Sequence, residues 1–162
     1  MDTRDPAARV LLVTDWRIDP HAVVAAAARR HSRSEASFGL LVPAWLHGLD
    51  WAGDPAASVP CATRQLETIT MLAAAAGLTI HDAAVGDPDP VTAIGDALDR
   101  SAVGELLVCV PARRLASGPL ELARRAHRAT GLPVSRVAVP AAVAPRSRWL
   151  HRRPRHCAPV AI

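Results

Sequence analysis

Two short stretches of the chain carry residue types that could bind an anion. The first, RVLLVTD, ends in two polar residues, and the second, ELLVCVP, is followed by an arginine-containing loop. The candidate ligand-binding residues in these stretches are Thr14, Asp15, Arg113, Arg114, Ser117 and Gly118. Guanidinium groups form charge-assisted hydrogen bonds with phosphate and carboxylate oxygens. The chemistry indicated is anion binding, and the alternatives are that the two loop arginines are simply solvated or contact a partner protein.

Buried strands are expected to position these residues. Leu106 to Val110 is a continuous apolar run that Pro111 ends, and Arg9 to Asp15 has the same character, which is typical of strands covered on both faces. Further strands are predicted at 37–42, 78–85 and 134–139, and helices at 20–30, at 63–76, from Pro90 and from Pro119. Five strands alternating with four helices predict an α/β fold, a three-layer αβα sandwich around a parallel sheet.

A flavodoxin-like strand order, 3-2-1-4-5, would make the first and fourth strands neighbours where the winding of the chain reverses. In such sheets, ligands bind in the crevice beyond the carboxyl ends of the strands. Thr14 and Asp15 would then face the 111–118 loop, which also leads into a helix whose N-terminus attracts anions. Val42 and Gly86, which end two other predicted strands, join the candidate site.

The segment from Pro43 to Pro60 is interpreted as one long loop, because glycine and proline punctuate it. Loops longer than about 12 to 15 residues are usually functional or disordered. This loop contains Trp45 and Trp51, which a disordered linker rarely needs. The two rings are expected to pack over the domain as a collar, and the alternative is that they stack on a ligand.

The basic charge of the chain belongs to its C-terminal end. All 19 basic residues are arginine, and five of them lie in residues 141–162, which contain no acid. We therefore expect a domain at 8–140 and a mobile basic tail at 141–162. The tail could be a solvated end, or its arginines and Trp149 could bind nucleic acid or an anionic membrane surface. No apolar run approaches the roughly 18 residues of a transmembrane helix, and no signal peptide is recognisable, which favours a cytoplasmic protein.

The sequence does not point to a metal centre or a catalytic group. Cys61, Cys109 and Cys157 are odd in number and lack the paired spacing of a zinc site, so no disulfide framework is expected and Cys109 is interpreted as a reduced, buried thiol. His81 and Asp82 are adjacent on a predicted strand and point to opposite faces, which argues against a catalytic pair. We expect no metal and no catalysis.

Over about residues 8–140 the chain resembles the universal stress protein family. The resemblance is carried by RVLLVTD, by the block ATRQLETITMLAAAAGLTIHDAAVGDP, and by ELLVCVP followed later by TGLPVSRVAVP. It implies an α/β domain of the adenine-nucleotide α-hydrolase-like superfamily, with Asp15 matching the aspartate of ATP-binding members. Those members also carry a glycine-rich phosphate loop, G-x-x-G, about nine residues, then G-S/T, after the fourth strand. This chain has Pro111-Ala112-Arg113-Arg114 there, so the usual triphosphate cradle is expected to be lost.

The resemblance favours a non-enzymatic stress-response protein that acts by self-association or partner binding and needs no cofactor. Such domains commonly dimerise through the last strand, and an exposed sheet edge invites pairing. The candidate homodimer edge consists of Val134, Arg136, Val137 and Val139. The alternative is a sensor that binds ATP, AMP or another small anion in the crevice.

Overall fold

A computed structural model describes residues 8–46, 55–112 and 119–142 of the chain. Its strands are β1 (Ala8–Thr14), β2 (Ala36–Pro43), β3 (Ile80–Gly86), β4 (Glu105–Pro111) and β5 (Val134–Val139). Its helices are α1 (Pro20–Arg33), α2 (Val59–Ala75), α3 (Pro90–Arg100) and α4 (Pro119–Thr130), and a 3-10 helix, η2, spans Pro55–Ser58.

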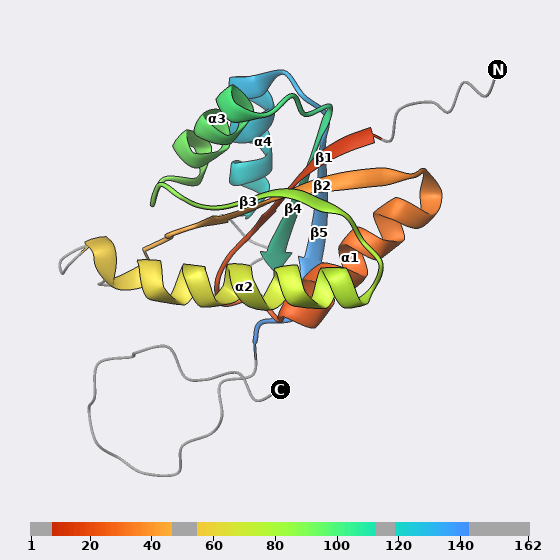
Figure 1. Cartoon of the computed structure of the whole chain (residues 1–162). Coiled ribbons are helices and arrows are strands. Elements are labelled where there is room, and N and C mark those ends of the chain that lie inside the picture. The colour runs from red at the N-terminus through yellow and green to blue at the C-terminus, as the bar shows by residue number, and fades with distance from the viewer. Residues whose placement is uncertain (1–7, 47–54, 113–118, 143–162) are drawn as a thin grey trace, which may run out of the picture.

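The five strands form one parallel sheet in the order β3-β2-β1-β4-β5, which is the predicted order. Helices α1 and α2 cover one face of the sheet, and α3 and α4 cover the other (Figure 1). The prediction of a three-layer αβα sandwich is therefore confirmed. β3 lies at one edge of the sheet, and β5 lies at the other.

The sheet separates two hydrophobic clusters, and β1 contributes to both. Val10 and Leu12 pack in the cluster beneath α1 and α2, whereas Leu11 and Val13 pack in the cluster beneath α3 and α4. This division follows from the alternation of side chains along a strand. It explains why the first strand is a continuous apolar run rather than an alternating one.

The helices begin and end largely where capping residues predict. The Asp19 carboxylate accepts a hydrogen bond from the His21 N–H at the start of α1, and Asp89 accepts one from the Thr92 N–H at the start of α3. A proline follows each cap, where no backbone donor is missed. Gly77 and Gly131 follow α2 and α4 with φ values of 72° and 70°, the left-handed conformation that glycine adopts readily.

The interpretation of 43–60 as one continuous loop is wrong at its C-terminal end. Residues 55–58 form η2, and α2 begins at Val59, earlier than predicted. Pro60 does not prevent this, because a proline in the first helical turn displaces no hydrogen bond. The Ser58 hydroxyl donates to the Ala44 carbonyl at 2.7 Å, which ties the start of α2 to the end of β2.

After β5 the chain crosses the loop that leaves β1. Ile18 and Ala141 form an isolated antiparallel bridge, the Asp19 N–H donates to Pro140 O at 3.1 Å, and the Ala142 N–H donates to Arg17 O at 2.8 Å. The segment predicted as a tail thus begins with two residues that contact the domain. Residues 143–162, including Trp149 and the five tail arginines, lie outside the described residues. In the described ranges, no helix is long and apolar enough to cross a membrane.

Candidate functional site

β1 and β4 are neighbours, as the crevice hypothesis requires, and Thr14 aligns with Cys109 at their carboxyl ends. Thr14 is 2% exposed and Asp15 is 3% exposed. Asp15 Oδ1 accepts a hydrogen bond from the Arg17 backbone N–H at 3.0 Å, and Oδ2 lies 4.0 Å from Arg17 Nε. The Asp15 carbonyl also accepts from the Ile18 N–H at 3.2 Å. The aspartate that could face a ligand therefore also organises the turn after β1.

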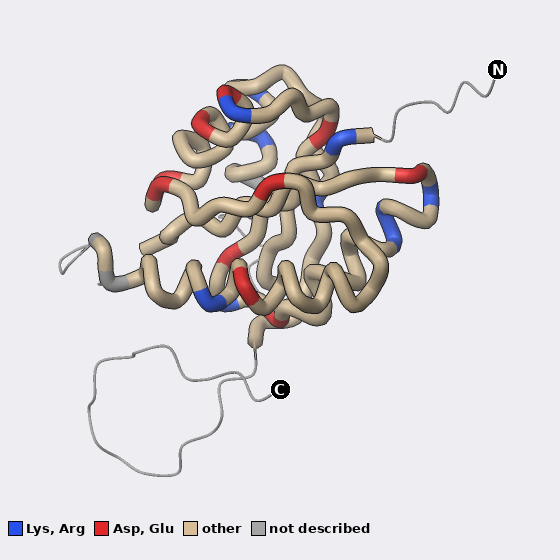
Figure 2. Tube along the Cα trace, viewed as in Figure 1, with Lys and Arg blue, Asp and Glu red and all other residues tan. Residues whose placement is uncertain are grey.

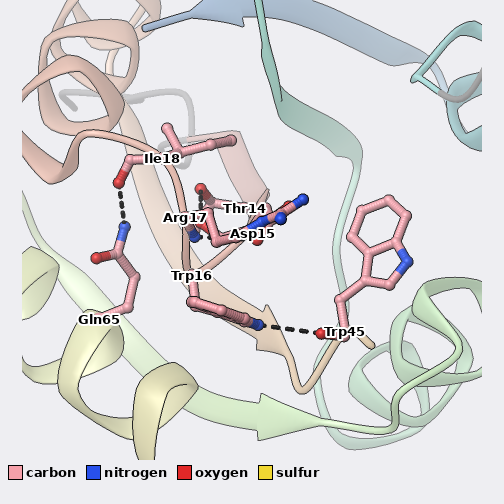
Figure 3. A network of polar contacts seen from close by, with 7 residues as sticks. All are labelled: Thr14, Asp15, Trp16, Arg17, Ile18, Trp45 and Gln65. Carbon is pink, nitrogen blue, oxygen red and sulfur yellow. Dashed lines mark hydrogen bonds and ion pairs between the residues drawn. The ribbon is translucent and has the colours of Figure 1, made fainter. Parts of the chain in front are cut away.

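Trp16 and Trp45 connect the loop after β1 to the loop after β2. Trp16 Nε1 donates to the Trp45 carbonyl at 3.1 Å, and the Trp45 ring points away from Trp16 (Figure 3). The Arg17 guanidinium carbon lies 5.7 Å from the centroid of the Trp16 ring, within the range of a cation–π contact. The half-buried Trp45 ring packs against the cluster beneath α3 and α4, which agrees with the predicted collar. Trp51 lies outside the described residues.

Gln65 of α2 stabilises the loop after β1 from the side of the sheet that α1 and α2 cover. It is 5% exposed, and its Nε2 donates to the Ile18 carbonyl at 2.8 Å (Figure 3). A buried carbonyl without a partner is costly, so this amide stabilises the path of the loop after β1. Sequence reasoning missed Gln65, Trp16 and Arg17. The available signals were a polar residue beside the apolar stripe of α2 and an aromatic-basic pair directly after Asp15.

Gly86 and Val42 lie where the strand order predicts, but packing accounts for both residue types. A Cβ atom on Gly86 would lie 2.6 Å from Ala93 Cβ and 2.9 Å from Leu41 Cδ1. Glycine is therefore needed for the close approach of β3 to α3, whether or not a ligand binds. The Val42 side chain is fully buried in the cluster beneath α1 and α2, so only its backbone could face a ligand.

Directly after β4, the Ala112 N–H donates to Val139 O at 2.8 Å. The remaining candidates, Arg113, Arg114, Ser117 and Gly118, lie outside the described residues, so their role as an anion clamp stays a prediction.

A hollow of about 490 Å³ opens beside the crevice, on the face covered by α3 and α4. Its lining comes from the loop after β2, the turn between β3 and α3, and helix α4: Trp45, Leu46, Pro88, Asp89, Pro90, Leu122 and Arg125. We call it the Trp45 hollow. Its volume falls within the roughly 300 to 1,000 Å³ of small-molecule sites. It combines an aromatic ring, apolar side chains, one carboxylate and one guanidinium.

The polar groups of the Trp45 hollow form a partly exposed ion pair. Arg125 Nη2 lies 3.3 Å from Asp89 Oδ1, and the two side chains are 48% and 44% exposed. Asp89 Oδ2 accepts hydrogen bonds from the N–H and the hydroxyl of Thr92. Burial opposes ionisation of Asp89, but the bonds from Thr92 and the charge of Arg125 outweigh it and lower the pKa of this carboxyl. Sequence reasoning predicted a helix from Pro90 but identified neither Asp89 nor Arg125 as a site residue.

The candidate dimer edge lies on β5, whose partner in the sheet is β4. Val139 is 2% exposed and packs in the cluster beneath α1 and α2. Val137 packs partly against that cluster, and Val134 packs partly against the opposite one. The side chains of these valines thus pack in or against the hydrophobic core. A dimer contact at this edge would have to use the backbone of β5 and its exposed side chains.

One cysteine differs from expectation. Cys109 is a free, buried thiol as predicted, and burial raises its pKa to about 12. Cys61, at the start of α2, is disulfide-bonded, so the expectation that no disulfide forms is wrong for this residue. In the part of the chain that the structure describes, no group of three or more His, Cys, Asp or Glu side chains could hold a metal ion.

Comparison with known proteins extends the description of the fold. No protein-family model matches the chain, and no curated protein matches it. Among solved structures, it is similar to a crystal structure of a universal stress protein in complex with cAMP, with a TM-score of 0.55 and 19% sequence identity. The match covers 82% of this chain and 98% of the other. At this identity the likeness shows that the two proteins share a fold.

Proposed function

We propose that this chain is a non-enzymatic, universal-stress-like protein that binds an adenine nucleotide in the Trp45 hollow. The observation that carries the proposal is the pairing of an aromatic ring with a guanidinium group at the carboxyl end of a parallel sheet. Ligands of such sheets bind at this end. The structural neighbour was crystallised with cAMP, which supports a nucleotide as the class of ligand.

Each part of a nucleotide has a counterpart in the hollow. The Trp45 ring offers a face on which a purine base can stack, and such stacking contributes about 1–3 kcal/mol per base in nucleic-acid complexes. Arg125 can turn from Asp89 to a phosphate, because a half-exposed surface ion pair is weak. Asp89 can then accept a hydrogen bond from a sugar hydroxyl.

Isothermal titration of AMP, ATP and cAMP into the purified protein tests this function. Arg125→Gln should weaken binding of the preferred nucleotide by about tenfold or more, since it removes a charge-assisted contact. Trp45→Leu should weaken it through the loss of stacking. Arg128→Gln is the matched control, because Arg128 lies on the same helix and is exposed outside the hollow. Equal affinity of the wild type and the Arg125 variant would contradict the proposed site.

Self-association through β5 is the second candidate function, because β5 is the outermost strand on its side of the sheet. The carbonyls of Pro133 and Val139 accept bonds from β4, so alternation directs the backbone of Ala138 to the outer edge. Ala138→Pro would remove that outward donor without breaking a bond to β4. Light scattering should find a wild-type dimer and a monomeric Ala138→Pro variant. A monomeric wild type would contradict this function. A cytoplasmic location and a role in the stress response stay predictions.

A further inference from the structure

A second hollow, of about 270 Å³, lies between α1 and the edge strand β5. Arg29, Arg30 and Arg33 line it from α1, and Ser135 and Arg136 line it from β5. We call it the arginine hollow. Figure 2 shows basic positions along the part of α1 that leads into β2. Glu105, which bonds to residues of the hollow, is the first residue of β4, so this hollow lies toward the amino ends of the strands. It is thus separate from the Trp45 hollow at their carboxyl ends.

One arginine of the hollow is neutralised within the fold. Arg30 Nε and Nη2 each lie 2.8 Å from Glu105 Oε2, and the two side chains are 17% and 18% exposed. Ser135 Oγ donates to Glu105 Oε1 at 3.1 Å, and Arg30 Nη1 donates to Ser34 O at 3.2 Å. These bonds hold the side chains of Arg30 and Ser135 in place at the edge of the hollow. Glu105 is thereby occupied on both oxygens and is not available to the other arginines.

The other three arginines retain their full charge. Within residues 8–46, 55–112 and 119–142, no hydrogen bond or ion pair is formed by the guanidinium groups of Arg29, Arg33 and Arg136. Arg29 and Arg33 are one helical turn apart, so their side chains lie on the same side of α1. Arg136 aligns with Val108, which packs beneath α3 and α4, so its side chain leaves the sheet on that face, away from Arg29 and Arg33. Arg29 and Arg33 place two like charges in one concave region, which raises the local affinity for anions.

The arginine hollow has an apolar wall toward the sheet, although Arg29 and Arg33 are themselves exposed. Arg29 is near enough to the buried Cys109 thiol to oppose, through its charge, the rise in the pKa of that thiol. Leu107 and Ala26, both buried, form part of the lining and supply this apolar wall. Charged contacts are stronger beside such a wall than in bulk water.

We propose that the arginine hollow binds a small ligand through a phosphate group that carries two or more negative charges. Guanidinium groups bind phosphate oxygens in a bidentate manner, and those of Arg29 and Arg33 can together hold one phosphate or a diphosphate. The lining contains no aromatic side chain, and the volume lies below the usual range for drug-sized ligands. The hollow therefore suits the phosphate end of a ligand and not a stacked base, which distinguishes it from the Trp45 hollow.

Calorimetric titration with inorganic pyrophosphate and with orthophosphate, at low and at physiological salt, tests the proposal. The wild type should bind pyrophosphate in a saturable manner and more tightly than orthophosphate. The double variant Arg29→Gln/Arg33→Gln should weaken pyrophosphate binding at least tenfold. The matched control is Arg100→Gln/Arg128→Gln, which removes the same charge from exposed positions on α3 and α4.

The control variant separates a site from general electrostatics. Equal weakening in both double variants would overturn the proposal, because it would show attraction to net charge alone. Absence of saturable binding in the wild type would overturn it as well. Duplex DNA binding that depends on Arg29 and Arg33, without pyrophosphate binding, would replace the small ligand with a nucleic acid. Circular dichroism verifies that each variant is folded, which the exposure of Arg29 and Arg33 leads us to expect.

Discussion

Replacement of Gly86 by alanine should destabilise the protein, although alanine is usually the better residue in regular structure. The added Cβ would lie 2.6 Å from Ala93 Cβ and 2.9 Å from Leu41 Cδ1, both closer than van der Waals contact. Ala93 is 1% exposed and has no rotamer by which to move aside. α3 would have to shift away from β3 to relieve the clash.

The magnitude follows from the cost of overpacking a core, which is about 1–3 kcal/mol. A protein of this size loses about 2–4 °C of melting temperature per kcal/mol, so Gly86→Ala should lower the Tm by about 2–12 °C. Gly95→Ala is the matched control, because Gly95 lies within α3 and its added Cβ would meet nothing within 4 Å. That change should stabilise by about 0.5–1 kcal/mol, because alanine loses less backbone entropy in a helix.

Urea denaturation followed by circular dichroism, together with thermal melts, measures both effects. The two variants make the same chemical change and should shift the free energy of unfolding in opposite directions. A Gly86→Ala protein as stable as the wild type would refute the packing explanation. Gly86 would then have to be explained by something other than the approach of β3 to α3, such as contact with a ligand.

Four other predictions concern three side chains, Asp89, Cys109 and Gln65. Asp89→Ala should lower the free energy of unfolding, measured in urea, by about 0.5–2 kcal/mol, because α3 loses its cap. Asp89→Asn should retain most of the stability that the cap provides. Equal losses in the two variants would contradict a capping role. Hydrogen bonds from Thr92 and the charge of Arg125 lower the Asp89 pKa, so ionised Asp89 stabilises the fold above the unfolded pKa of about 3.9, and this contribution is lost as the pH falls through the folded pKa. In Asp89→Asn this part of the acid-induced loss of unfolding free energy should be absent. A variant whose stability falls with pH as steeply as that of the wild type would contradict this explanation. Cys109, with a pKa of about 12, should react with a thiol reagent at pH 8 far more slowly in the native than in the unfolded protein, and similar rates would show that the thiol is accessible. Gln65→Leu should cost about 1–3 kcal/mol in urea denaturation, because it leaves the Ile18 carbonyl without its partner, and a neutral effect would contradict that role.

The sequence predicted the architecture well because its signals are local and repeated. Continuous apolar runs such as Leu106 to Val110 identify strands covered on both faces, and Asp19 and Asp89 cap helices that begin with proline. The alternation of strands and helices then restricts the topology to few choices. The sequence does not determine where α2 begins, because Pro60 is equally compatible with a loop and with the first turn of a helix.

The candidate sites were less predictable, because they depend on contacts between distant residues. Asp89 and Arg125 are 36 residues apart, and Arg30 and Glu105 are 75 residues apart, so nothing in the local pattern joins either pair. Gly86 illustrates the opposite difficulty: a glycine at a strand end suggests a ligand, whereas contact with Ala93 already requires it. Spacing alone cannot separate these two reasons.

The most direct test of the central claim is a crystal structure of the full chain grown with AMP. The base should give density over the Trp45 ring, and the phosphate should lie within hydrogen-bond distance of Arg125. AMP bound at another place on the molecule, or no AMP at saturating concentration, would contradict the claim that the Trp45 hollow is the nucleotide site.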